Sequence, residues 1–234
     1  MIQQSAKSIV HPGNGAMRNG HDRLRHIQEY CQSLLHRLPW PGETQVDAPR
    51  TLGITSCRRG EGVSTIAASL AAAAASWGDY RILLADANVA KPSAHEYFGV
   101  PLCPGWANIP QNGDALAKHI QPTSMFNLSV LAAGIPDEQN TSAGVALGSP
   151  GLVKELSADF DLTIFDLPPM ESSNDAARLA ALLDGVVLVV EAELSRRDDV
   201  RRACELLTRF GARPLGVVLN KFRQSVPKWL ARAL

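Results

Sequence analysis

The chain has 234 residues, which is long for one average domain and short for two. Lysine and arginine together number 23, and aspartate and glutamate also number 23, so the formal net charge is zero. This balance argues against bulk electrostatic binding of nucleic acid or of an anionic membrane. The composition, 45% hydrophobic and 20% charged, is typical of a globular protein and excludes a disordered one.

The cysteines argue against a disulfide framework or a zinc site. They are Cys31, Cys57, Cys103 and Cys204, and no two of them form a CxxC pair. A reducing cytosol is therefore the expected compartment. No apolar run approaches the roughly 20 residues of a membrane span, and the first residues lack the apolar core of a signal peptide. The sequence thus predicts a cytoplasmic protein.

The amino-terminal fifth of the chain differs in pattern from the rest. Residues 1–20 mix Gln, Ser, Gly, Asn and Pro without periodicity, which predicts a flexible arm. Residues 21–50 are predicted to contain a helix over 22–38 with one apolar stripe, followed by a polar linker. Pro39 and Pro41 end that helix.

Residues 51–234 alternate strand and helix patterns and are predicted to form a single domain. Apolar and β-branched runs predict strands at 51–56, 81–86, 128–133, 162–166, 185–191 and 214–220. Helices are predicted over 63–77, which is rich in alanine, and over 196–210, which is charged. Strands that alternate with helices form βαβ units, so we expect an α/β fold with a mostly parallel central sheet flanked by helices.

The turn after the first predicted strand has the context of a phosphate-binding loop. Its candidate nucleotide-binding residues are Arg58, Arg59, Gly60, Glu61, Gly62, Val63, Ser64 and Thr65. Glycines let backbone N–H groups turn inward, and the start of the following helix adds partial positive charge. The pattern GxxxxGK[ST] fits at Gly62 and Ser64, but Cys57 replaces its first glycine and Val63 replaces its lysine. Taken alone, the loop is equally consistent with an ordinary tight turn.

Three further segments resemble the bacterial tyrosine kinases. Residues 81–100, RILLADANVAKPSAHEYFGV, resemble the second nucleotide motif of that family, in which a strand precedes DxDxRRP and a helix. Residues 160–170, FDLTIFDLPPM, resemble its Walker B stretch, and residues 216–220, GVVLN, resemble the strand whose asparagine contacts adenine in related ATPases. With similar matches at 127–134 and 174–192, the resemblance covers residues 29–220.

The resemblance implies a P-loop NTPase fold over residues 51–234 and a site for ATP or ADP with Mg²⁺. It implies catalytic roles for Asp86 and Asp166, contact of Mg²⁺ with both aspartates and Ser64, and contact of adenine with Asn220. Members of the family serve capsule and exopolysaccharide export and phosphorylate a tyrosine-rich carboxyl-terminal tail.

The departures from the family pattern predict an impaired site. Val63 removes the lysine that contacts the β- and γ-phosphates, and Asn88 and Ala90 replace an aspartate and an arginine of the second motif. Nucleotide binding is therefore expected to be weak or absent, and chemistry severely reduced, because transition-state charge loses its partners. Glu61 is expected to add negative charge beside the phosphates. No tyrosine follows Tyr97, so the tail substrate is also missing.

Other cations are candidates to replace the lost lysine. Arg58 occupies the position of the signature lysine of the septum-site and partitioning ATPases, and Arg59 and Lys91 lie nearby in the motifs. The alternative is that these arginines are merely solvated.

The resemblance and the departures together predict a regulatory or scaffolding protein of exopolysaccharide or capsule biosynthesis. Its expected partner is a membrane-embedded polysaccharide co-polymerase or export component, or an active paralogous kinase, and such a partner would recruit it to the inner membrane. Homo-oligomers are compatible with this reading, and nucleic acid is not an expected partner. The alternatives are an active ATP-dependent tyrosine kinase with an unorthodox site and a partitioning-type ATPase.

Overall fold

The computed structural model describes residues 30–35, 50–109, 116–136, 150–172 and 174–222. Their strands form one seven-stranded sheet in the order β3-β4-β2-β5-β1-β6-β7. The strands are β1 (Thr51–Ser56), β2 (Ile82–Asp86), β3 (Ile120–Pro122), β4 (Leu128–Leu131), β5 (Leu162–Asp166), β6 (Gly185–Glu191) and β7 (Pro214–Asn220). All neighbouring strands are parallel except β3 and β4. The predicted mostly parallel α/β sheet is confirmed.

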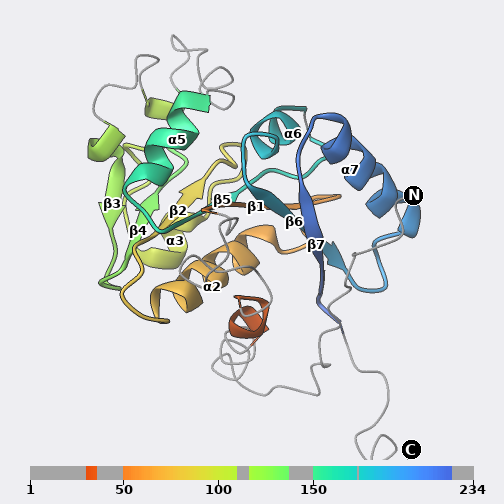
Figure 1. Ribbon diagram of the computed structural model, residues 1–234, viewed down its shortest axis with the longest axis horizontal. Coiled ribbons are helices and arrows are strands. Elements are labelled where there is room, and N and C mark those ends of the chain that lie inside the picture. Colours follow the sequence, from red (N-terminus) through yellow and green to blue (C-terminus); the bar gives the residue numbers. More distant parts are fainter. Residues whose placement is uncertain (1–29, 36–49, 110–115, 137–149, 173, 223–234) are drawn as a thin grey trace, which may run out of the picture.

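Helices cover both faces of this sheet (Figure 1). They are α2 (Val63–Ala75), α3 (Ala94–Phe98), α5 (Pro150–Ala158), α6 (Asn174–Ala180) and α7 (Arg197–Arg209), with 3-10 turns at Trp106–Asn108 and Leu116–His119. One hydrophobic cluster joins α2 and the start of α3 to one face of the sheet, and a second joins α5, α6 and α7 to the other. The central strands are therefore buried on both faces, which explains their continuous apolar sequences.

Helix α2 packs closely on the sheet because its buried face consists largely of alanine. Ala67, Ala71 and Ala74 are fully buried there. Residues 30–35, red in Figure 1, are helical and bury Cys31, Leu34 and Leu35 in the same cluster. Each buried leucine contributes about 1.5–3 kcal/mol relative to an exposed one. This part of the predicted apolar stripe is thus buried as expected, whereas the predicted arm at 1–20, the linker and the rest of the 22–38 helix lie outside the described residues.

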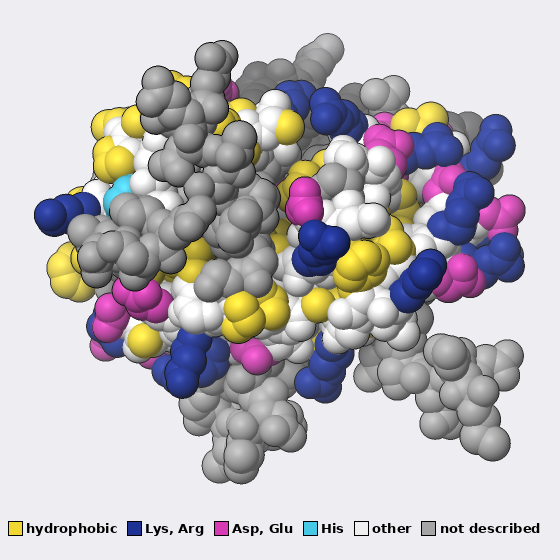
Figure 2. Space-filling model, turned by 90° about the horizontal axis from the view of Figure 1, so that it is seen from above, with side chains coloured by type: hydrophobic (Ala, Val, Ile, Leu, Met, Phe, Trp, Pro, Cys, Tyr) yellow, Lys and Arg dark blue, Asp and Glu magenta, His cyan; other side chains and the backbone are white. Residues whose placement is uncertain are grey.

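The outer surface of α7 carries charged side chains of both signs. On the face shown in Figure 2, basic and acidic side chains alternate at the right, over α7. Arg201 lies 3.3 Å from Asp198 and 3.8 Å from Glu205. This pattern is typical of a solvated helix face. Within the described ranges, no helix is long and apolar enough to cross a membrane.

Candidate nucleotide site

The loop between β1 and α2 has the backbone shape that its glycines predict. Gly60 and Gly62 have φ angles of 87° and 95°, a region that favours glycine, and Gly62 caps the amino terminus of α2. A Cβ atom on Gly62 would lie 2.2 Å from the amide nitrogen of Asn220. Gly62 is therefore required both by its backbone angle and by the side chain that packs over it.

The loop borders a cavity of about 250 Å³. The residues that line it are Ser56, Arg59, Gly60, Gly62, Val63, Ser64, Thr65, Asn88, Lys91, Ser93, Tyr97, Leu167 and Pro169. Small-molecule sites typically enclose about 300–1,000 Å³, so this cavity is slightly smaller than that range. The structure thus brings the predicted loop residues and the second motif together at the carboxyl edge of the sheet, where parallel sheets place their ligands.

Val63 presents an apolar side chain to this cavity. Its side chain is largely buried and belongs to the hydrophobic cluster under α2. The position at which a phosphate-binding loop carries its lysine therefore has no charge to offer a phosphate.

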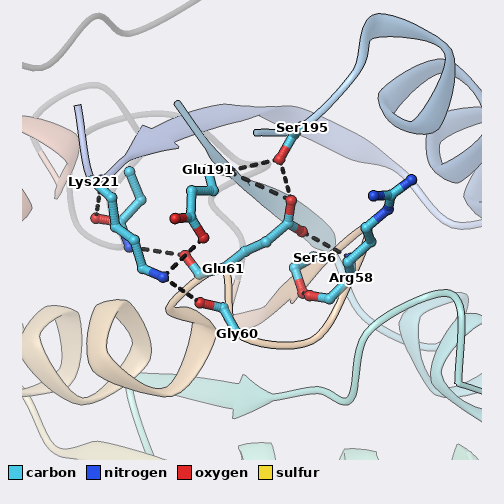
Figure 3. Close-up of polar contacts among 8 residues, drawn as sticks. Ser56, Arg58, Gly60, Glu61, Glu191, Ser195 and Lys221 are labelled. Carbon is cyan, nitrogen blue, oxygen red and sulfur yellow. Dashed lines mark hydrogen bonds and ion pairs between the residues drawn. The ribbon is translucent and has the colours of Figure 1, made fainter. Parts of the chain in front are cut away.

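The carboxylate of Glu61 is directed toward Ser195 and the Arg58 N–H (Figure 3), and it does not line the cavity, contrary to the expectation that it adds negative charge beside the phosphates. It is buried and accepts hydrogen bonds from the backbone N–H of Arg58 at 2.8 Å and from the Ser195 hydroxyl. The N–H of Glu191 lies 3.5 Å away. Glu61 thus ties the loop to the turn between β6 and α7. The orientation follows from these donors, which only the folded chain brings together.

The end of β7 holds the loop from the same side. The Asn220 amide donates to the backbone oxygen of Glu61 at 2.9 Å, and its own oxygen accepts from the N–H of Lys221 at 2.8 Å. The Lys221 ammonium donates to the backbone oxygen of Gly60 at 2.6 Å and pairs with Glu191 at 2.8 Å. Both ends of the Asn220 amide are therefore engaged within the chain, and contact with adenine requires one of these bonds to be exchanged.

Replacing Glu61 with alanine is expected to destabilise the fold by about 2–3 kcal/mol. The substitution leaves the Arg58 N–H and the Ser195 hydroxyl without their acceptor, and an unsatisfied buried donor costs about 1–3 kcal/mol. Urea denaturation of the wild type and the variant measures the difference. Glu205→Ala, which removes the same charge from the exposed face of α7, is the matched control. Equal stability of both variants would contradict the anchoring role of Glu61.

Asp86 and Asp166 end adjacent strands in register, as the sequence predicts. Asp86 is fully buried and accepts three backbone hydrogen bonds: from Asn88 at 3.0 Å, Ser93 at 2.9 Å and Ala94 at 3.0 Å. Burial raises the pKa of Asp86, and these three donors oppose the rise. Its carboxylate therefore closes the loop between β2 and α3.

Asp166 has a different environment. Burial and the nearby charge of Asp86 raise its pKa to about 8, and a hydrogen bond from the Ser64 side chain opposes this rise. Among the described residues, its Oδ1 atom has no hydrogen-bond partner. A buried, unpaired carboxylate oxygen beside a hydroxyl group suits a hard cation, so Ser64 and Asp166 are the residues that fit Mg²⁺. Mg²⁺ retains several waters and needs few protein ligands.

The two adjacent arginines of the loop lie on opposite sides. Arg59 lines the cavity, whereas the Arg58 guanidinium lies 2.8 Å from Asp199 of α7. Arg58 and Cys57 line a second cavity of about 280 Å³ beside α7. The structure thus places Arg58 apart from the other predicted nucleotide-binding side chains. Burial raises the pKa of Cys57 to about 12, which disfavours a reactive thiolate.

Three side chains at this site, those of Tyr97, Ser195 and Lys221, were not among the predicted site residues. Tyr97 lines the cavity, is half exposed, and lies 2.7 Å from the Thr65 hydroxyl. Ser195 and Lys221 hold the loop as described above. Lys221 directly follows Asn220 at the end of a predicted strand, and that adjacency was the available signal.

Comparison with known proteins identifies the family. A family model described as "ParA: NUBPL iron-transfer P-loop NTPase" matches residues 47–229. The putative tyrosine-protein kinase CapB of Staphylococcus aureus is 34% identical over 74% of this chain and 75% of its own length. The tyrosine-protein kinase CpsD of Streptococcus agalactiae is 30% identical over 87% of each chain. The chain belongs to the bacterial tyrosine-kinase family, within the ParA-type P-loop NTPases.

Solved structures of the bacterial tyrosine-kinase family share this fold. The chimerical protein CapA2B2 superposes with a TM-score of 0.70 at 28% identity, over 88% of this chain and 87% of its own. The kinase domain of the Escherichia coli tyrosine kinase ETK has a TM-score of 0.74 at 23% identity, over 87% and 77%. The second likeness concerns the fold alone. The predicted P-loop NTPase fold is confirmed.

Proposed function

We propose that this chain is a regulatory or scaffolding member of the bacterial tyrosine-kinase family with little or no phosphotransfer activity of its own. Val63 carries this proposal. Its apolar, largely buried side chain stands where a phosphate-binding loop provides a lysine. In phosphoryl transfer, catalysis rests on positioning and on stabilising the charge of the transferred group. Removing the lysine from the loop therefore affects the rate more than the binding.

The second motif supports the same proposal. Asn88 lines the cavity with a neutral amide, and Asp86 directs both carboxylate oxygens to backbone N–H groups. Mg²⁺, when bound, would neutralise charge on the phosphates, and among the described residues we assign only Ser64 and Asp166 to hold it. The chain also contains only three tyrosines, of which none follows Tyr97.

The role proposed in place of catalysis is docking in a capsule or exopolysaccharide system. The partner is a membrane-embedded co-polymerase or export component, or an active paralogous kinase that phosphorylates other proteins. Support comes from the family itself, whose members include CapB and CpsD kinases, and from the solved CapA2B2 chimera. Such a partner would recruit the chain to the membrane.

The direct test measures ATP hydrolysis and tyrosine phosphorylation by the purified chain with Mg²⁺. We expect turnover at least a hundredfold below the about 1–100 per second of ordinary kinases, because the cavity lacks the charges that the transition state needs. Turnover within that ordinary range would refute the proposal and favour the alternative, an active kinase. That alternative is supported by the ordered loop and by the two cations, Arg59 and Lys91, that line the cavity.

A further inference from the structure

We propose that Arg59 and Lys91 together hold the phosphate groups of a nucleotide in place of the missing loop lysine. This inference rests on the proposed function in one respect, namely that the cavity is a nucleotide site with Val63 at its lysine position. Among the side chains that line the cavity, only these two carry charge at neutral pH, and both are positive. An apolar or cationic ligand is therefore disfavoured, and a polyphosphate is the chemical class that matches the lining.

The backbone of the loop that carries Lys91 is held by the buried carboxylate of Asp86. The loop that carries Lys91 is closed by three backbone N–H groups, of Asn88, Ser93 and Ala94, that donate to Asp86. The N–H of Lys91 itself donates to the backbone oxygen of Asn88 at 3.0 Å. The cation thus stands on an ordered turn that also contributes Asn88 and Ser93 to the cavity lining.

The position of Arg59 is set from the other side of the cavity. Its backbone N–H donates to the Glu171 carboxylate at 2.9 Å, and the left-handed Gly60 follows it. Arg59 comes from the loop after β1 and Lys91 from the loop after β2, so the two cations approach the cavity from different strand ends. Two separated cations are suited to a chain of phosphates rather than to a single carboxylate.

The charge of both side chains is available to a ligand. Within the part of the chain that the structure describes, neither the Arg59 guanidinium nor the Lys91 ammonium forms an ion pair. Arg58, by contrast, is paired with the largely buried Asp199 at 2.8 Å and faces the second cavity. Adjacent arginines therefore provide a matched comparison: one is free to bind phosphate and the other is occupied.

Titration calorimetry with ADP and Mg²⁺ tests the inference on the full chain. We expect Arg59→Met and Lys91→Met each to weaken ADP binding about tenfold, because each loses a charge-assisted contact, and Arg58→Met to change it less than about twofold. Lys91→Arg should retain affinity. A merely structural loss would not be reversed by this change of one cation for another. Thermal melting of each variant checks its fold.

The inference is overturned if Arg58→Met weakens binding as much as the other two variants, if Arg59→Met and Lys91→Met leave binding unchanged, or if the wild type shows no heat with millimolar ADP. Absence of binding leaves the proposed docking role intact. Conversely, the wild type could turn over ATP at a kinase-like rate while its ADP affinity depends on Arg59 and Lys91. That result refutes the proposed function and supports this inference.

Discussion

Replacing Val63 with lysine is expected to raise the affinity for ATP and ADP by about tenfold to a hundredfold. A hydrogen bond to a charged group contributes about 1.5–3 kcal/mol, and the lysine would stand at the mouth of the cavity that Val63 now lines. The aliphatic stem of a lysine can occupy the apolar space of the valine while its ammonium reaches the phosphates. Titration calorimetry of the wild type and the variant measures the gain.

Val63→Met is the matched control for this substitution, because it adds length without charge. An equal gain in affinity for the methionine variant would contradict the electrostatic explanation. Val63→Lys combined with Asn88→Asp is expected to raise ATP hydrolysis above that of the wild type, since the pair returns a cation and an anion to the cavity lining. Unchanged turnover in this double variant would show that the loss of activity has another cause.

The second large effect is expected at Asp166. Its native pKa is about 8, whereas its unfolded value is near 3.8. Between these two values the folded chain holds a proton that the unfolded chain has lost, so the contribution of Asp166 to stability is greatest below about pH 4 and falls as the pH rises toward 8. Asp166→Asn removes this dependence. We compare the free energy of unfolding of the variant with that of the wild type. We expect this difference to shift in favour of the variant by about 2–4 kcal/mol between pH 5 and pH 8.

Urea denaturation at several pH values, without divalent cations, measures this dependence. Asp198→Asn, on the exposed face of α7, removes a carboxylate that has no comparable burial and is the control. Parallel stability curves for the wild type and Asp166→Asn would show that Asp166 is not protonated in the folded chain. Added Mg²⁺ is expected to lower the pKa of Asp166 and to reduce the difference between the two proteins.

The sequence predicts the sheet well because its central strands have an unambiguous pattern. β6, for example, is apolar on both faces and is buried over nearly its whole length. β3 was not predicted, because three partly exposed residues that end in Pro122 have no readable period. The loop glycines were predicted from the strand–loop–helix context, and Asp86 and Asp166 from the resemblance of their strands to the motifs of bacterial tyrosine kinases.

The orientations of the side chains at the site could not be predicted from the sequence. Arg58 and Arg59 are adjacent and chemically identical, yet one pairs with Asp199 and the other lines the cavity. Glu61 likewise turns toward Ser195, which is 134 residues away along the chain. These choices depend on donors and acceptors that only the complete fold assembles. The local sequence pattern therefore predicted the position of the loop, whereas long-range contacts determine the orientation of each side chain in it.

The three backbone bonds to Asp86 bear on how such motifs are interpreted across a family. Because this carboxylate closes the β2–α3 loop, the folded domain needs it whether or not the site transfers phosphate. An aspartate at this strand end is then evidence of common ancestry and of a loop to be closed. It does not distinguish an active site from an inactive one, and that distinction has to be drawn from residues that line the cavity, such as Val63 and Asn88.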